Sequence, residues 1–112
     1  MESFADCIKR EFFEELGIKV KPGKLLFVQQ FISDRDGWDE ELELFFQVED
    51  SSEFDTIDIT KTSHGLIEIS RVEFVDPKEV YILPAFLSEI DVKAYTDGKN
   101  STYIYDRLTT AE

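Results

Sequence analysis

The first eighteen residues carry a fixed pattern of charged, apolar and glycine positions that restricts what this chain can be. Glu2 is separated by seven residues from the segment Arg10–Ile18, which reads Arg-Glu-Phe-Phe-Glu-Glu-Leu-Gly-Ile. Six polar or glycine positions and two apolar positions at set distances should coincide by chance in well under about one in a million windows, even in an acidic chain. An ordinary solvated acidic helix face is therefore a poor explanation of this stretch.

The spacing predicts a helix over residues 3–16 with its carboxylates gathered on one side. At about 100° per residue, Glu11, Glu14 and Glu15 fall within an arc of about 100°. Such a cluster repels itself, and a hard divalent cation with oxygen ligands would remove the repulsion. The residue types therefore favour a site for Mg²⁺ or a similar ion.

The ends of this helix and its buried side can also be predicted. Ser3 is suited to the N-cap, with Asp6 three residues on in the position of a capping box. Gly17 stands where a helix commonly ends in a left-handed residue. A neighbouring apolar stripe can face a core: Ala5, Ile8, Phe12 and Leu16.

The segment resembles the Nudix box, the signature of hydrolases that cleave nucleoside diphosphates linked to another moiety. That pattern is Gly, five residues, Glu, seven residues, Arg-Glu, an apolar residue, any residue, Glu-Glu, any residue, Gly and an apolar residue. Every position from Glu2 onward matches. The opening Gly would fall six residues before Glu2, so we expect the strands that precede the motif to be missing. The resemblance implies an α+β fold, a Nudix-like α/β/α sandwich with a mixed sheet that lacks its N-terminal strands.

The resemblance also implies roles for individual residues. Glu11, Glu14 and Glu15 would bind Mg²⁺ or Mn²⁺, and Glu11 is either a ligand or the base for the attacking water. Arg10 would orient a motif glutamate, so that the catalytic residues are Arg10, Glu11 and Glu14. The chemistry is attack of a metal-activated water on a diphosphate phosphorus, with no covalent nucleophile and no further cofactor. Candidates for an additional carboxylate outside the motif are Glu68 and Glu73.

Composition narrows the partners and the compartment. The chain has 112 residues, 42% apolar residues and ten phenylalanines, as expected of a single globular domain over residues 1–112. A net charge of −13 argues against nucleic acid and anionic membrane as partners. A nucleotide-type small molecule is the partner that the resemblance implies. The lone Cys7 allows no internal disulfide, which fits the cytoplasm.

Further elements follow from alternation and turn residues. Strands are predicted at residues 24–33, 41–49, 66–75 and 102–105. Turns are predicted at Pro22-Gly23 and over residues 76–80. Residues 51–63 form a polar connection with weak β character. An amphipathic helix should begin at Pro84, with a buried side made of Phe86, Leu87 and Ile90.

Three functions compete. The first is a Nudix hydrolase acting on a nucleoside diphosphate derivative, with weak or no turnover in this short form because the missing strands usually contribute to the pocket. The second is a non-catalytic Nudix remnant that binds metal or protein, and the third is a generic acidic interaction domain. A sheet without its first strands should expose unpaired edges, which predicts a homodimer unless the natural protein starts upstream.

Overall fold

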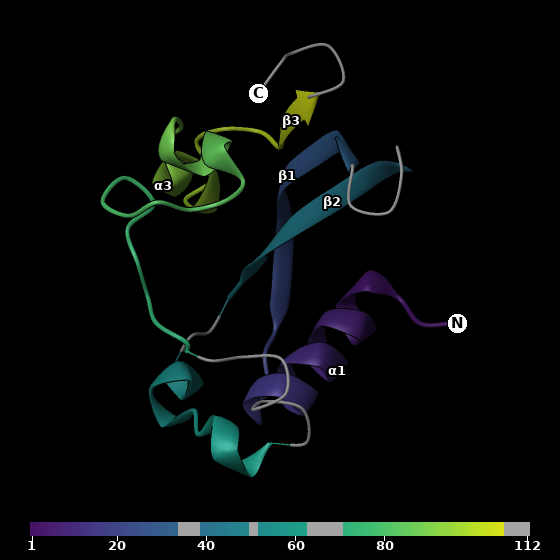
Figure 1. Cartoon of the computed structure of the whole chain (residues 1–112), viewed down its shortest axis with the longest axis vertical. Coiled ribbons are helices and arrows are strands. Elements are labelled where there is room, and N and C mark those ends of the chain that lie inside the picture. Colours follow the sequence, from purple (N-terminus) through teal and green to yellow (C-terminus); the bar gives the residue numbers. More distant parts are fainter. Residues whose placement is uncertain (34–38, 50–51, 63–70, 107–112) are drawn as a thin grey trace. The chain divides into compact units, whose positions relative to one another are not determined.

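The computed structural model describes residues 1–33, 39–49, 52–62 and 71–106, and it has an α+β fold (Figure 1). In chain order the elements are α1 (Phe4–Leu16), β1 (Pro22–Ser33), β2 (Asp39–Val48), the 3₁₀ helices η1 (Ser52–Thr56), η2 (Ile59–Lys61) and η3 (Ala85–Ser88), α3 (Val92–Thr96) and β3 (Tyr103–Asp106). None of the helices in the described ranges has the length and apolar character needed to cross a membrane.

The chain divides into two compact units, and each unit is built from two stretches of sequence. The first unit comprises Met1–Gly23 and Val48–Val75, and the second comprises Lys24–Gln47 and Asp76–Glu112. Helix α1 belongs to the first unit, and nearly the whole sheet belongs to the second. The single domain over residues 1–112 stays a prediction.

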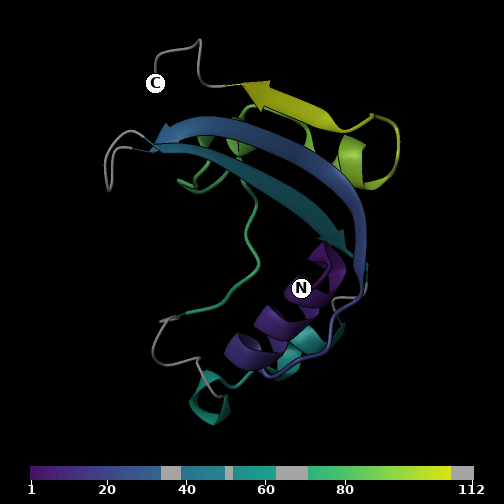
Figure 2. The same ribbon diagram turned by 90° about the vertical axis from the view of Figure 1, so that its right-hand side faces the viewer.

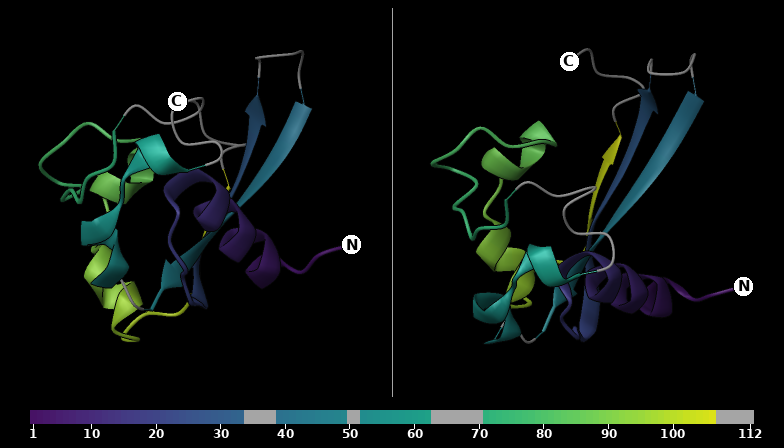
Figure 3. Two further views of the ribbon diagram at one scale, coloured as in Figure 1. Left: turned by 90° about the horizontal axis from the view of Figure 1, so that it is seen from below. Right: turned by 60° about the horizontal axis from the view of Figure 1, so that its bottom comes forward.

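The sheet of the second unit has three strands in the order β2-β1-β3 (Figure 3). Strand β3 runs parallel to β1, with Phe27 opposite Tyr103 and Gln30 opposite Asp106. Strand β2 runs antiparallel to β1 (Figure 2), so the sheet is mixed. The strands predicted at residues 24–33, 41–49 and 102–105 are confirmed.

Aromatic rings fill the core of the second unit. Phe27 is 3% exposed and Phe86 is 1% exposed, and their ring centres lie 5.6 Å apart in an edge-to-face arrangement. Tyr95 approaches Phe27 at 5.2 Å, and Tyr105 approaches Phe86 at 5.0 Å. Such pairs contribute about 0.5–1.5 kcal/mol each beyond the area that they bury. The aromatic cluster therefore holds η3 and α3 against the sheet.

The core of the first unit forms where α1 ends. Leu16, Ile18 and Val20 are buried, and partly buried side chains of α1, β2 and the segment 52–58 pack against them. Phe12 meets Phe54 of η1 edge-on, with ring centres 5.9 Å apart, and η1 and η2 lie beside α1 (Figures 1 and 2). The predicted apolar stripe is confirmed at Ile8, Phe12 and Leu16, whereas Ala5 is exposed.

One predicted strand, in its described part, and one predicted turn are wrong. Residues 71–75 have no regular secondary structure, and Phe74 is 71% exposed. A strand needs a neighbour for its hydrogen bonds, and this stretch pairs with none of the described strands. The rest of that prediction, residues 66–70, lies outside the described residues. Pro22-Gly23 is not a turn but the start of β1, where proline is tolerated because the first residue need not donate.

Two further predictions differ from the structure in the type of element. The connection over residues 51–63 contains η1 and η2, with no β structure in its described part. The helix expected from Pro84 is divided into η3 and α3, because Asp91 between them has an extended backbone (φ −88°, ψ 92°). Its predicted buried side is confirmed at Phe86, and the turn at residues 76–80 is confirmed by the bond from the Glu79 amide to the Asp76 carbonyl oxygen.

Candidate functional site on helix α1

Helix α1 carries four of the predicted site residues, Arg10, Glu11, Glu14 and Glu15, and it is fixed at both ends. At the N-terminus the Ser3 hydroxyl oxygen accepts a 3.1 Å hydrogen bond from the Asp6 amide, as predicted. At the C-terminus Gly17 is left-handed (φ 71°), and its amide donates to the Phe13 carbonyl oxygen at 3.0 Å. The Thr62 hydroxyl donates to the Glu15 carbonyl oxygen at 2.9 Å. These contacts hold the helix through its last turn.

Arg10 lies at the centre of an ionic cluster on this helix. Its Nη2 is 2.6 Å from Glu2 Oε1, and its Nη1 is 3.2 Å from both Glu11 Oε1 and Glu14 Oε2. The Nε atom also donates to both oxygens of Glu2, and Nη2 lies 3.9 Å from the Cys7 Sγ. The predicted pairing of Arg10 with a motif glutamate is confirmed. Arg10 pairs with three motif glutamates: Glu2, Glu11 and Glu14.

The ionic cluster shifts the pKa values of two of its members, Glu2 and Arg10. The hydrogen bond from Arg10 lowers the pKa of the Glu2 carboxyl below its usual range, and the attraction of the positive charge adds to the effect. The same contact raises the pKa of Arg10, with a smaller contribution from Glu14. One guanidinium contacts three carboxylates, so the cluster has a net negative charge.

Glu11 and Glu14 converge on a single atom. Because both carboxylates lie 3.2 Å from Arg10 Nη1, their two nearest oxygens are separated by no more than twice that distance. Oxygen donors of this kind are what Mg²⁺ prefers, so the donor set fits the ion. Within the described ranges, however, no three or more His, Cys, Asp or Glu side chains are grouped so that they could hold a metal ion. The metal-binding roles of Glu11, Glu14 and Glu15 stay predictions.

Of the two candidates for an additional carboxylate outside the motif, only Glu73 lies in the described residues. Glu73 forms an ion pair with Arg71 in the exposed stretch before residue 76. Glu68 lies outside the described residues. An exposed side chain paired to its own neighbour is the common state of a surface glutamate.

A cavity lies on another side of α1 and was not predicted from the sequence. Lys9, Arg10, Phe13, Lys19 and Val20 line a space of about 520 Å³ within the first unit. The spacing of Lys9 and Phe13, four residues apart on one helix, was the signal that could have indicated it.

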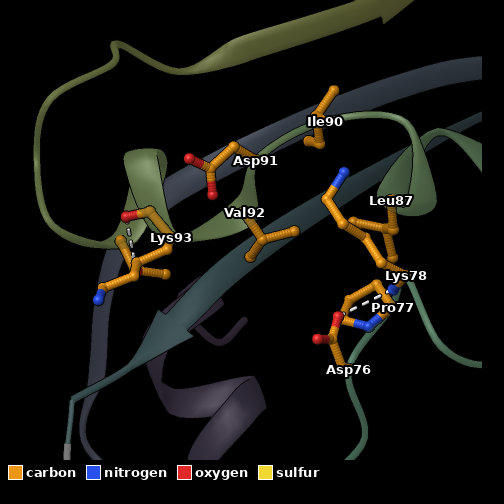
Figure 4. A pocket seen from close by; sticks show the side chains of 9 residues that line it. Asp76, Pro77, Lys78, Leu87, Ile90, Asp91, Val92 and Lys93 are labelled. Atoms are coloured by element: carbon orange, nitrogen blue, oxygen red, sulfur yellow. Dashed lines mark hydrogen bonds between the residues drawn. The ribbon is translucent and has the colours of Figure 1, made fainter.

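A second cavity lies in the second unit and has no residue of α1 (Figure 4). It measures about 380 Å³ and mixes two aspartates and two lysines with apolar side chains. The Lys78 side chain extends past Leu87, and its Nζ lies 3.5 Å from the Ser88 carbonyl oxygen. Its lining residues are Asp76, Pro77, Lys78, Leu87, Ile90, Asp91, Val92, Lys93 and Thr96.

Comparison with protein-family models, with curated proteins and with solved structures yielded no match.

Proposed function

We propose that this chain is a Mg²⁺-dependent hydrolase of the Nudix type that cleaves, with weak turnover, the diphosphate linkage of a nucleoside diphosphate derivative. The observation that carries the proposal is the motif spacing from Glu2 to Ile18, together with the convergence of Glu11 and Glu14 on one Arg10 nitrogen. The proposal includes a Nudix-like α/β/α sandwich as the fold, a homodimer as the active form and the cytoplasm as the compartment.

The side chains of α1 would divide the work. Glu11, Glu14 and Glu15 hold Mg²⁺ or Mn²⁺, and Glu11 alternatively accepts the proton of the attacking water. When bound, the cation supplies charge neutralisation at the phosphate oxygens and a lowered pKa of its water. Arg10 fixes the carboxylates of Glu11 and Glu14 before the substrate arrives, since its guanidinium contacts both. Because the carboxylates of Glu11 and Glu14 are already in position, they need not reorient during the reaction, and the barrier is lower.

Turnover of a substrate panel tests the proposal. ADP-ribose, dinucleoside polyphosphates and nucleoside triphosphates are incubated with the full chain, with and without Mg²⁺, and nucleotide or phosphate release is measured. Glu14→Gln should lower the rate about 100-fold or more, because it removes a ligand of the cation that would activate the attacking water. Glu89→Gln is the control, because it removes the same charge from an exposed position in the second unit.

Each outcome assigns one of the competing functions. Mg²⁺-dependent release that Glu14→Gln removes and Glu89→Gln keeps supports the hydrolase. Binding of Mn²⁺ without release of product from any substrate indicates the non-catalytic remnant. Absence of both identifies α1 as part of an acidic interaction domain and ends the proposal.

A further inference from the structure

The cavity beside α1 is cationic in a chain that is otherwise strongly acidic. Three of its five lining residues are Lys9, Arg10 and Lys19, and none of the five is acidic. The chain as a whole has 25 acidic residues against 12 basic ones. All five residues lie between positions 9 and 20, so the cavity belongs to the first unit alone. A local excess of positive charge on such a chain favours an anionic ligand.

Helix geometry separates this cavity from the acidic side of α1 while keeping the two adjacent. On an ideal helix Lys9 and Phe13 lie about 40° apart, and Glu11 lies about 160° from Phe13. Arg10 falls between them, about 60° from Phe13 and about 40° from Glu14. The guanidinium of Arg10 contacts the Glu14 carboxylate at 3.2 Å, and the same residue lines the cavity. Arg10 is therefore the boundary between the two surfaces.

The turn after the helix brings the second lysine to the cavity. Left-handed Gly17 ends α1, and the following residues alternate in burial. Ile18 is 2% exposed and Val20 is 7% exposed, whereas Lys19 between them is exposed. Val20 thus supplies an apolar wall, and Lys19 supplies a charge at the rim.

The two lysines and the aromatic ring have no competing partners in the part of the chain that the structure describes. Neither Lys9 nor Lys19 makes an ion pair there, in contrast to Arg10, whose guanidinium is held by three glutamates. The ring of Phe13 is 57% exposed and contacts no other described aromatic ring, whereas adjacent Phe12 packs on Phe54. An exposed ring flanked by cations suits stacking with a flat, anionic ligand.

We propose that this cavity binds a nucleoside phosphate, with the base stacked on Phe13 and the phosphates paired with Lys9 and Lys19. The choice of ligand rests on the proposed function, but the binding needs neither metal nor turnover. The volume of about 520 Å³ lies within the usual range for small-molecule sites, about 300–1,000 Å³. A phosphate chain that extends past Arg10 would run toward the Glu14 carboxylate, which Arg10 contacts at 3.2 Å.

The test is binding of ADP to the full chain in EDTA. Calorimetry measures the affinity, and the amide chemical shifts of residues 9–20 locate the site. Replacing both lysines (Lys9→Gln with Lys19→Gln) should weaken binding about tenfold, since each exposed ion pair contributes up to about 1 kcal/mol. Phe13→Ala should also weaken it about tenfold, as loss of one stacked base does. The control pair Lys61→Gln with Lys99→Gln removes the same charge at exposed positions elsewhere and should leave the affinity unchanged.

Two simpler ligands separate the halves of the site. Pyrophosphate should lose affinity only with the lysine pair, and adenosine only with Phe13→Ala. Absence of ADP binding in EDTA overturns the inference, as does equal binding by the wild type and all variants. Binding that depends on Lys9, Phe13 and Lys19 in a chain that hydrolyses no substrate supports this inference and rejects the proposed hydrolase. Glu14→Gln should remove hydrolysis and leave ADP binding in EDTA intact.

Discussion

The hydroxyl of Thr62 donates a 2.9 Å hydrogen bond to the backbone carbonyl oxygen of Glu15, although 47 positions separate the two residues. The last carbonyl groups of a helix have no partner within it, so they depend on such contacts or on water. The methyl group of Thr62 also lies 3.1 Å from the place that a Cβ atom on Gly17 would take. The segment after η2 therefore fits closely around the end of the candidate site helix.

Replacing Gly17 with alanine should destabilise the protein by about 1–2 kcal/mol, because the left-handed backbone strains any side chain and the new Cβ presses on Thr62. Urea unfolding measures the change. Gly98→Ala is the matched control: it has φ 85°, but its Cβ would meet only the flexible end of Lys24 at 3.5 Å. Equal losses in the two variants would show that the contact with Thr62 contributes nothing.

The carboxyl group of Glu2 should titrate below the usual range of a glutamate because Arg10 hydrogen-bonds its ionised form. A lowered pKa in the folded state means that the pair contributes stability above the pKa of an unfolded-chain glutamate. That contribution is lost as the pH falls through the lowered value. Carboxyl chemical shifts recorded against pH measure it.

Arg10→Gln should raise the pKa of Glu2 back toward the ordinary value. Asp58 is the internal control, since its pKa is lowered by hydrogen bonds from Thr60 and has no contribution from Arg10. If the Glu2 titration is the same in the wild type and in Arg10→Gln, the ionic cluster does not persist in solution.

Mn²⁺ should bind the wild-type chain and bind at least about tenfold more weakly to the double variant Glu14→Gln with Glu15→Gln, since hard cations require carboxylate oxygens. Isothermal titration gives the affinities. The control double variant, Glu40→Gln with Glu41→Gln, removes the same charge from exposed positions on β2. Equal affinity in both double variants would mean that Mn²⁺ responds to net charge and not to α1.

Phe86→Ala should cost about 3–5 kcal/mol, because the ring is 1% exposed and its loss leaves a cavity among the rings of Phe27, Phe45 and Tyr105. Thermal and urea unfolding measure the loss. Tyr81→Ala serves for comparison, since that side chain is 90% exposed and its removal should change stability by less than about 0.5 kcal/mol.

The chain should form a dimer at micromolar concentration. In the described part of the sheet, β2 and β3 are the outer strands, and Leu42 and Ile104 on them are 62% and 72% exposed. Sedimentation of the double variant Leu42→Lys with Ile104→Lys should show mainly monomer. A second variant, Tyr81→Lys with Leu83→Lys, adds the same charge at other exposed positions and should stay dimeric. A monomeric wild type contradicts the prediction.

Local signals explain most of what the sequence predicted correctly. Ser3, Gly17 and the apolar spacing between them define α1 within a residue, because caps and periodicity act over a few positions. The strands β1, β2 and β3 follow from alternation and β-prone residues in the same way. The Arg10–Glu14 contact was predictable because residues four apart on a helix are neighbours.

The errors occur where structure depends on distant partners. Residues 71–75 have strand-like composition but lie beside no strand in the described ranges, and sequence pattern cannot supply one. The predicted strand at residues 102–105 contains Tyr103 and Tyr105, but no pattern in the sequence shows that these two rings and Tyr95 share one core with Phe27 and Phe86. The cavity at Lys9 and Phe13 needed the reversal of the chain at Gly17, which brings Lys19 back beside the helix.

The parallel pairing of Phe27 with Tyr103 also sets the order in which this chain can fold during synthesis. Residue 103 is synthesised 76 positions after residue 27, a delay of about 4–15 s at ordinary translation rates. Residues 48–75, which belong to the other unit, are made in between. Until then Leu26 and Phe27 lack part of the core that covers them. Nascent-chain chaperones therefore have a window of seconds in which to engage β1, and yield in cells should depend on them more than the small size of the chain suggests.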